Sequence, residues 1–155
     1  MNPRDRIKIL AAGLAGLGTA TAARAENQGL VPAQPISNQP WKVVMQISDS
    51  LKQAYEGLIN IQNVLELDPQ MKFVVVGYGD AIEFLLEGAK TPQGALFSGM
   101  IGNLANLGVQ FRACNNTLTF MNIPLSKLAL EATVVPAGVY EIVKLQSEGY
   151  YYVKP

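Results

Sequence analysis

The fold of this chain is decided by one stretch, Val109-Gln110-Phe111-Arg112-Ala113-Cys114-Asn115-Asn116-Thr117-Leu118. Apolar and polar residues alternate from Val109 to Ala113, which is typical of a half-buried strand. The Asn-Asn-Thr run that follows contains residues that favour helix starts, and Leu118 begins the next apolar spacing. We therefore predict a short strand that ends at Cys114 and passes directly into a helix.

Cys114 is the one cysteine of the chain. A thiol just before a helix N-terminus lies near unpaired backbone N–H groups, which favour its thiolate form. Free cysteine is also among the most buried residue types, so a small apolar packing residue at a strand end is the opposing interpretation. The residues alone leave both interpretations open.

Strands and helices are predicted to alternate along the rest of the chain. Besides the Cys114 strand, we expect strands at Lys42–Ile47, Lys72–Val76, Thr133–Val135 and Tyr150–Val153, with apolar helical spacing between them. The last helix, which begins at Pro136-Ala137-Gly138, is expected to bury Val139, Ile142 and Val143. This alternation predicts an α/β domain with a five-stranded parallel sheet between helices, in which ligands bind at the carboxyl ends of the strands.

Composition excludes several kinds of site. The chain has no histidine, so His-dependent triads and His metal sites are excluded. A single cysteine can form neither an intramolecular disulfide nor a thiolate zinc cluster. Twelve basic and twelve acidic residues give no basic excess, so we expect no nucleic-acid partner. No metal or organic cofactor is expected.

The N-terminal segment is typical of an export signal. Three basic residues precede an apolar run at Ile9–Ala23, and Ala23-Arg24-Ala25 fits a signal-peptidase site. The run is shorter than the ~20 residues that span a bilayer, although an uncleaved anchor stays the alternative. We expect residues 1–25 to be cleaved, residues 26–40 to form a flexible linker, and residues 41–155 to form the domain. Export to a bacterial periplasm follows, with no membrane attachment after cleavage.

Other polar residues are expected at the same sheet edge as Cys114. Asp49 and Asp80 each follow a strand, where two carboxylates could do acid–base chemistry. Each also precedes a helix, where aspartate is a favoured cap, so capping is the favoured interpretation. Tyr78 could line a pocket or pack as a buried aromatic. Arg112 could support a thiolate, although a surface or interface role is favoured because its side chain points away from the face of Ala113.

With these residues in view, the chain resembles the DsrE/DsrF-like family of small α/β sulfur-relay proteins, which includes TusD-type subunits. The resemblance covers residues 41–155 and rests on the Cys114 stretch and on the tail Val134-Val135-Pro136-Ala137-Gly138-Val139-Tyr140-Glu141-Ile142-Val143-Lys144-Leu145-Gln146. It implies a single flavodoxin-like domain, assembly into oligomers and, in sulfur-carrying members, a persulfide on the cysteine that corresponds to Cys114. An export signal departs from the family's best-known relay partners, which are cytoplasmic.

Two classes of function remain. In the first, Cys114 carries sulfane sulfur as a persulfide between a donor and an acceptor protein, and Asn115, Asn116 and Thr117 order the turn. In the second, the chain is a non-catalytic oligomeric module for small-ligand binding or redox sensing, and Cys114 is structural or forms an intermolecular disulfide. Whether the chain is an enzyme stays open. The aromatic run at Tyr150–Tyr152 exceeds what one core face can bury, which favours a homo-oligomer.

Overall fold

A computed structural model describes residues 39–155. The expected signal segment at 1–25 and the linker up to residue 38 lie outside the described residues. The elements, in chain order, are β1 (Lys42–Ile47), α3 (Leu51–Leu67), β2 (Lys72–Gly77), η1 (Gly79–Leu85), α4 (Phe97–Asn106), β3 (Gln110–Cys114), α5 (Asn115–Phe120), η2 (Leu125–Lys127), β4 (Ala132–Val135), α6 (Gly138–Ser147) and β5 (Tyr151–Val153).

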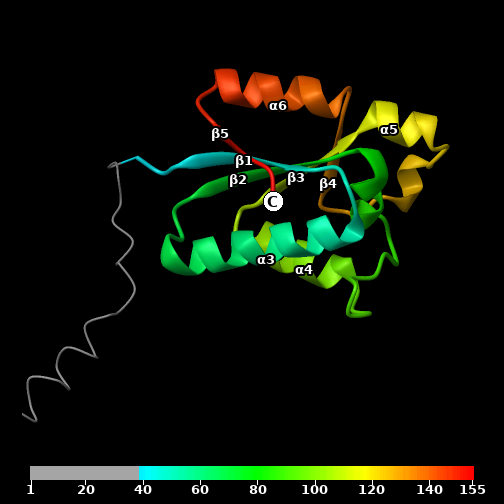
Figure 1. The fold of residues 1–155 in the computed structure, drawn as a ribbon, viewed down its shortest axis with the longest axis horizontal. Helices are drawn as coiled ribbons and strands as arrows, with labels where there is room; N and C mark the ends of the chain where they lie inside the picture. Colours follow the sequence, from blue (N-terminus) through cyan, green and yellow to red (C-terminus); the bar gives the residue numbers. More distant parts are fainter. Residues whose placement is uncertain (1–38) are drawn as a thin grey trace, which may run out of the picture. The chain divides into compact units, whose positions relative to one another are not determined.

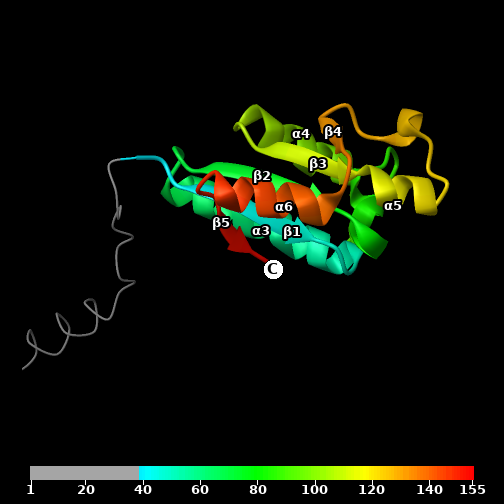
Figure 2. The ribbon, with the colours of Figure 1, turned by 90° about the horizontal axis from the view of Figure 1, so that it is seen from above.

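The five strands form one parallel sheet in the order β4-β3-β2-β1-β5. From β1 to β4 the chain moves across the sheet in one direction, and α6 then carries it back to place β5 beside β1. Helices α3 and α4 cover one face and α6 covers the other (Figures 1 and 2). The predicted α/β domain with a five-stranded parallel sheet between helices is confirmed, and β5 is an edge strand as expected.

Both faces of the sheet are packed. Alternate residues of the central strands, such as Met45 and Val75, join the larger core under α3 and α4. Their neighbours Val44, Val74 and Val76 form a smaller core with Ile142 and Leu145 of α6. The near-continuous apolar runs of β1 and β2 follow from this burial on two sides.

Register fixes which residues share the carboxyl edge of the sheet. Ile47 pairs with Gly77, and Gly77 pairs with Ala113. Cys114 pairs with Val135 of β4. The residues that follow Ile47, Gly77 and Ala113 therefore lie in one row at this edge, although they come from distant parts of the chain. They are Ser48, Tyr78 and Cys114.

The N-terminus of α3 corrects one expectation. Ser50 is the N-cap, and its hydroxyl accepts the backbone N–H of Gln53 at 3.1 Å. The buried Gln53 side chain in turn accepts the backbone N–H groups of Ser48 and Asp49. The capping role expected of Asp49 is therefore wrong, because Ser50 occupies the N-cap position.

The buried side of α6 also differs from the expectation. Gly138, Glu141, Ile142 and Leu145 face the sheet, whereas Val139 and Val143 are each 59% exposed. Helical spacing puts positions 138, 141, 142 and 145 on one face, so the two valines turn outward. The prediction that Val139 and Val143 are buried is wrong, and their exposure leaves an apolar outer surface on α6.

Two short segments are 3₁₀ helices, η1 and η2. Asp80 lies inside η1, whose N-cap is Tyr78, so the capping role expected of Asp80 is also wrong. Gly79, at the start of η1, has φ 57°, and an added Cβ there would lie 2.7 Å from the carbonyl oxygen of Ser48. This close approach needs glycine and brings the β1 and β2 turns together.

Candidate functional site

Cys114 ends β3 and directly precedes α5. Its thiol is free, and the residue is only 5% exposed. Phe111 and Ala113 point into the core beneath α3 and α4, so Arg112 and Cys114 face the α6 side of the sheet. The thiol is therefore reached from the α6 side or from the carboxyl edge of the sheet.

The surroundings of the sulfur favour the thiolate. Burial raises the pKa of the Cys114 thiol, but hydrogen bonds from the Thr117 hydroxyl and from the backbone N–H groups of Thr117, Gly138 and Asn116 lower it. The net effect holds this pKa below its ordinary value of 9.0. The direction agrees with the expectation from a helix N-terminus, because N–H and O–H donors stabilise negative charge on sulfur.

The donors come from two helices. Asn116 and Thr117 lie in the first turn of α5, and Gly138 is the first residue of α6. The sequence pattern indicates only the helix that begins at Asn115 as the source of this effect and gives Gly138 no role at the thiol. The signal that could have found it is the order of strand, Pro-Ala-Gly and helix, which starts α6 beside the end of β3.

Thr117 links the thiol to the turn after β2. Its hydroxyl oxygen accepts the backbone N–H of Gly79 at 3.2 Å, which leaves its hydrogen for the sulfur of Cys114. Next to it lies a hollow of about 270 Å³, lined by Gly79, Asp80, Asn116, Thr117, Phe120 and Met121. The structure therefore brings Asp80 together with Asn116 and Thr117, two residues that donate to the sulfur of Cys114. Tyr78 packs against Gly138 on the same edge.

Asp49 and Asn115 have other surroundings. A hydrogen bond from the Ser48 hydroxyl and the ammonium of Lys154, 2.9 Å away, lower the pKa of Asp49. Asp49 is thus engaged by a cation at the end of β1, which does not favour a shared-proton pair with Asp80. Asn115 is exposed and lines a separate surface hollow with Leu118 and Thr119.

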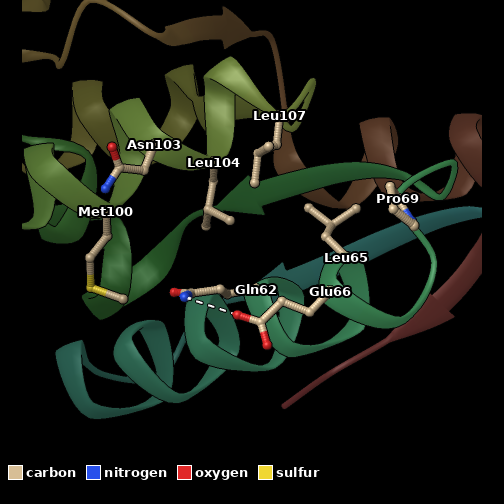
Figure 3. A pocket seen from close by; sticks show the side chains of 8 residues that line it. All are labelled: Gln62, Leu65, Glu66, Pro69, Met100, Asn103, Leu104 and Leu107. Atoms are coloured by element: carbon tan, nitrogen blue, oxygen red, sulfur yellow. Dashed lines mark hydrogen bonds between the residues drawn. The ribbon is translucent and has the colours of Figure 1, made fainter.

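A larger hollow lies between α3 and α4, away from the thiol. It has a volume of about 370 Å³, and its lining includes Leu65, Met100 and Leu104 together with Gln62 and Glu66. Figure 3 shows the amide of Gln62 directed at the carboxylate of Glu66, with 3.5 Å between Nε2 and Oε1. None of the residues that donate to the sulfur lines this hollow, so we do not include it in the site.

Residues 39–155 contain no group of three His, Cys, Asp or Glu side chains arranged to hold a metal ion. In the same part of the chain, no helix is long and apolar enough to cross a membrane.

Comparison with known proteins identifies the kind of domain. The profile described as the DsrE/DsrF-like family matches residues 11–155. The solved structure of a protein of unknown function, MTH1491 from Methanobacterium thermoautotrophicum, is 28% identical with a TM-score of 0.66, over 74% of this chain and 99% of its own. The ychN protein from E. coli shares the fold at 14% identity, with a TM-score of 0.61 over 76% of this chain and 99% of its own. No curated protein sequence matches this chain.

Proposed function

Because this chain belongs to the DsrE/DsrF-like family, we propose that it is a sulfur carrier that holds sulfane sulfur as a persulfide on Cys114. The observation that supports this proposal most directly is the set of donors around the sulfur, which lowers the pKa of the thiol despite its burial. A thiolate is the form that attacks sulfur, so these donors favour the nucleophile that the reaction requires.

The proposed step needs no external oxidant. The Cys114 thiolate attacks the outer sulfur of a donor persulfide, R–S–SH; a bond forms between the Cys114 sulfur and that outer sulfur, and the donor S–S bond breaks. The products are the Cys114 persulfide, which retains the proton, and the donor thiolate, R–S⁻. Attack by an acceptor thiolate on the outer sulfur of the Cys114 persulfide reverses the roles and regenerates the Cys114 thiolate.

Backbone donors suit this cycle because they serve every anionic state of the sulfur. The N–H groups of Asn116, Thr117 and Gly138 are fixed by α5 and α6. They can stabilise the thiolate before transfer and a deprotonated persulfide after it, with no change in their own protonation. A donor or acceptor would, in this proposal, approach over the hollow lined by Asn116 and Thr117, two of the residues that donate to the sulfur.

Burial of Cys114 favours a second candidate, a non-catalytic oligomeric binding module in which this residue only packs. A thiol that is 5% exposed is poorly placed to form a disulfide with another chain, so the redox-sensing version of that candidate is less favoured. The two functions differ in whether the sulfur ever becomes a nucleophile.

Mass spectrometry of the intact native protein separates the two candidates. After incubation with thiosulfate, polysulfide or a persulfidated donor protein, wild type is expected to gain ~32 Da, the mass of one sulfur atom. Cys114→Ser is expected to fold like wild type and to gain nothing. If wild type takes up no sulfur from any of these donors, the carrier function is wrong, and if Cys114→Ser is unfolded, the packing role is favoured.

A further inference from the structure

One ion pair ties the sheet to the helix that supplies the Gly138 N–H group. Arg112 Nε lies 3.9 Å from Glu141 Oε1, and the side chain of Glu141 is only 9% exposed. Arg112 Nε is itself buried, and no described residue accepts a hydrogen bond from it. A carboxylate buried to this degree needs compensating cations, and Glu141 has two. Lys144 Nζ lies 3.9 Å from Glu141 Oε2 but belongs to α6 itself, so Arg112 is the cation that ties this carboxylate to β3.

Each member of the pair is close in sequence to a residue of the site: Arg112 to Cys114, and Glu141 to Gly138. Arg112 lies two residues before Cys114 on the same face of β3, so the strand holds the two in a fixed relation. Glu141 lies in the first turn of α6, where its backbone N–H donates to the Ala137 carbonyl at 3.0 Å. Any shift of Glu141 relative to Arg112 therefore also moves Gly138 relative to Cys114.

We propose that Arg112 and Glu141 are positioning residues for Cys114: their ion pair fastens the first turn of α6 to β3 and so keeps the Gly138 N–H directed at the sulfur. Neither side chain is among the groups that hydrogen-bond to the sulfur. The role in sulfur transfer rests on the proposed carrier function, but the positioning of the N–H group does not.

Replacing Glu141 by an uncharged residue would change the pKa of Cys114 in two opposite ways, one through charge and one through the position of α6. Titratable or charged side chains near Cys114 include Arg112 on β3 and Glu141 and Lys144 on α6. Tyr78, directly after β2, and Asp80 on η1 lie at the same sheet edge. Removing the negative charge of Glu141 would, by Coulomb interaction alone, lower the pKa of the thiol further. Loosening α6 would withdraw an N–H donor and raise it, so the sign of the change identifies the mechanism.

The test is a pH titration of the full-length protein labelled with ¹³C at the cysteine Cβ, which gives a single resonance because the chain has one cysteine. Glu141→Ala is expected to raise the pKa of Cys114 and to slow its alkylation by iodoacetamide at neutral pH by about twofold to fivefold, the size of one helix-terminus interaction. Glu141→Gln is also uncharged, but it keeps the shape of the side chain and an oxygen beside Arg112 Nε. It is expected to show a smaller effect.

Glu148→Ala is the matched control. Glu148 also pairs with Lys144 at 3.9 Å but lies half exposed at the other end of α6, so its loss should leave the titration unchanged. If Glu141→Ala does not fold, Arg112→Lys is expected to raise the pKa in its place, because lysine keeps the charge but has no nitrogen at the position of Nε beside Glu141.

An unchanged or lowered pKa in folded Glu141→Ala, or in Arg112→Lys where that variant replaces it, overturns the positioning role. The carrier function is judged separately, by sulfur uptake in wild type. If the pKa of Cys114 rises in Glu141→Ala but wild type takes up no sulfur, the positioning role of Arg112 and Glu141 stands and the carrier function is refuted.

Discussion

Tyr78 lies against the α-carbon of Gly138. A Cβ added to Gly138 would be 3.0 Å from Cδ1 of the Tyr78 ring and 3.3 Å from the Tyr78 Cβ, closer than ordinary van der Waals contact. Tyr78, directly after β2, thus leaves little room for a side chain at the first residue of α6, the same residue whose N–H group donates to the sulfur of Cys114. A side chain at this position would have to displace either the ring or the helix.

Gly138→Ala is expected to shift Tyr78 or the first turn of α6 by a few tenths of an ångström and so to raise the pKa of Cys114. The unfolding free energy should fall by on the order of 1 kcal/mol, as in mild overpacking. A cysteine-Cβ titration and thermal denaturation measure the two effects. Gly99→Ala in α4 is the control: its Cβ would meet nothing within 4 Å, and about 0.5–1 kcal/mol of stabilisation is expected. An unchanged titration in Gly138→Ala would contradict the expectation.

Thr117→Val keeps the shape of the side chain and removes its hydroxyl. The sulfur of Cys114 then loses a donor and the Gly79 N–H loses its acceptor, so the pKa of the thiol should rise. Sulfur uptake should slow about tenfold, and the unfolding free energy should fall by about 1–3 kcal/mol for the unpaired N–H. Initial rates of the mass gain and urea denaturation measure these changes. Thr117→Ser, which retains the hydroxyl, should behave nearly like wild type, and equal losses in both variants would refute a role for the hydroxyl.

The stability difference between wild type and Cys114→Ser should depend on pH. The pKa of Cys114 is lowered in the folded state and is near 9.0 in the unfolded state. The stabilisation from the thiolate is then fully present above 9.0 and is lost as pH falls through the folded value. In urea denaturation from about pH 6 to about pH 9, the unfolding free energy of wild type should rise relative to that of the serine variant. The rise should be at most about 1.4 kcal/mol per pH unit. If the unfolding free energy of wild type instead falls relative to the serine variant as pH rises, the effect of burial on the pKa outweighs that of the hydrogen bonds.

Self-association is expected through apolar surface that the fold leaves uncovered. Val139 and Val143 on the outer side of α6 are each 59% exposed, and Tyr151 on the edge strand β5 is 65% exposed. The double variant Val139→Ser, Val143→Ser should shift the protein toward monomer in light scattering at micromolar concentration. Leu107→Ser, equally exposed but following α4 on the other side of the sheet, is the control. A monomeric wild type would contradict the prediction.

Export is expected from the N-terminal sequence. Protein recovered from the periplasm of the native host should begin at Glu26, after cleavage behind Ala25. N-terminal sequencing or intact-mass measurement of the fractionated protein checks this. Recovery from the cytosol of a chain that still carries residues 1–25 would contradict it.

Local pattern alone determined much of this protein. The apolar runs fixed where β1, β2 and β3 lie, and the Asn-Asn-Thr run after Cys114 fixed where α5 begins, because propensity and turn chemistry act over a few residues. Strict alternation of strands and helices was enough to predict a parallel sheet and to place Cys114 at its carboxyl edge. The same reasoning chose Asp49 as a cap where Ser50 serves, because both residue types favour that position.

Tertiary structure decided the rest. The rotation of α6 that exposes Val139 and Val143 depends on what the helix packs against, and several faces of this short helix carry apolar residues. The donors around Cys114 come from α5 and α6, and Gly138 and Glu141 reach that region only because β4 pairs beside β3. Strand order is set by the packing of all crossovers at once, so no local stretch of sequence carries it. The sequence could therefore nominate Cys114 and the α5 donors next to it, whereas the pairing of β3 with β4 adds the Gly138 N–H that helps to lower the pKa of its thiol.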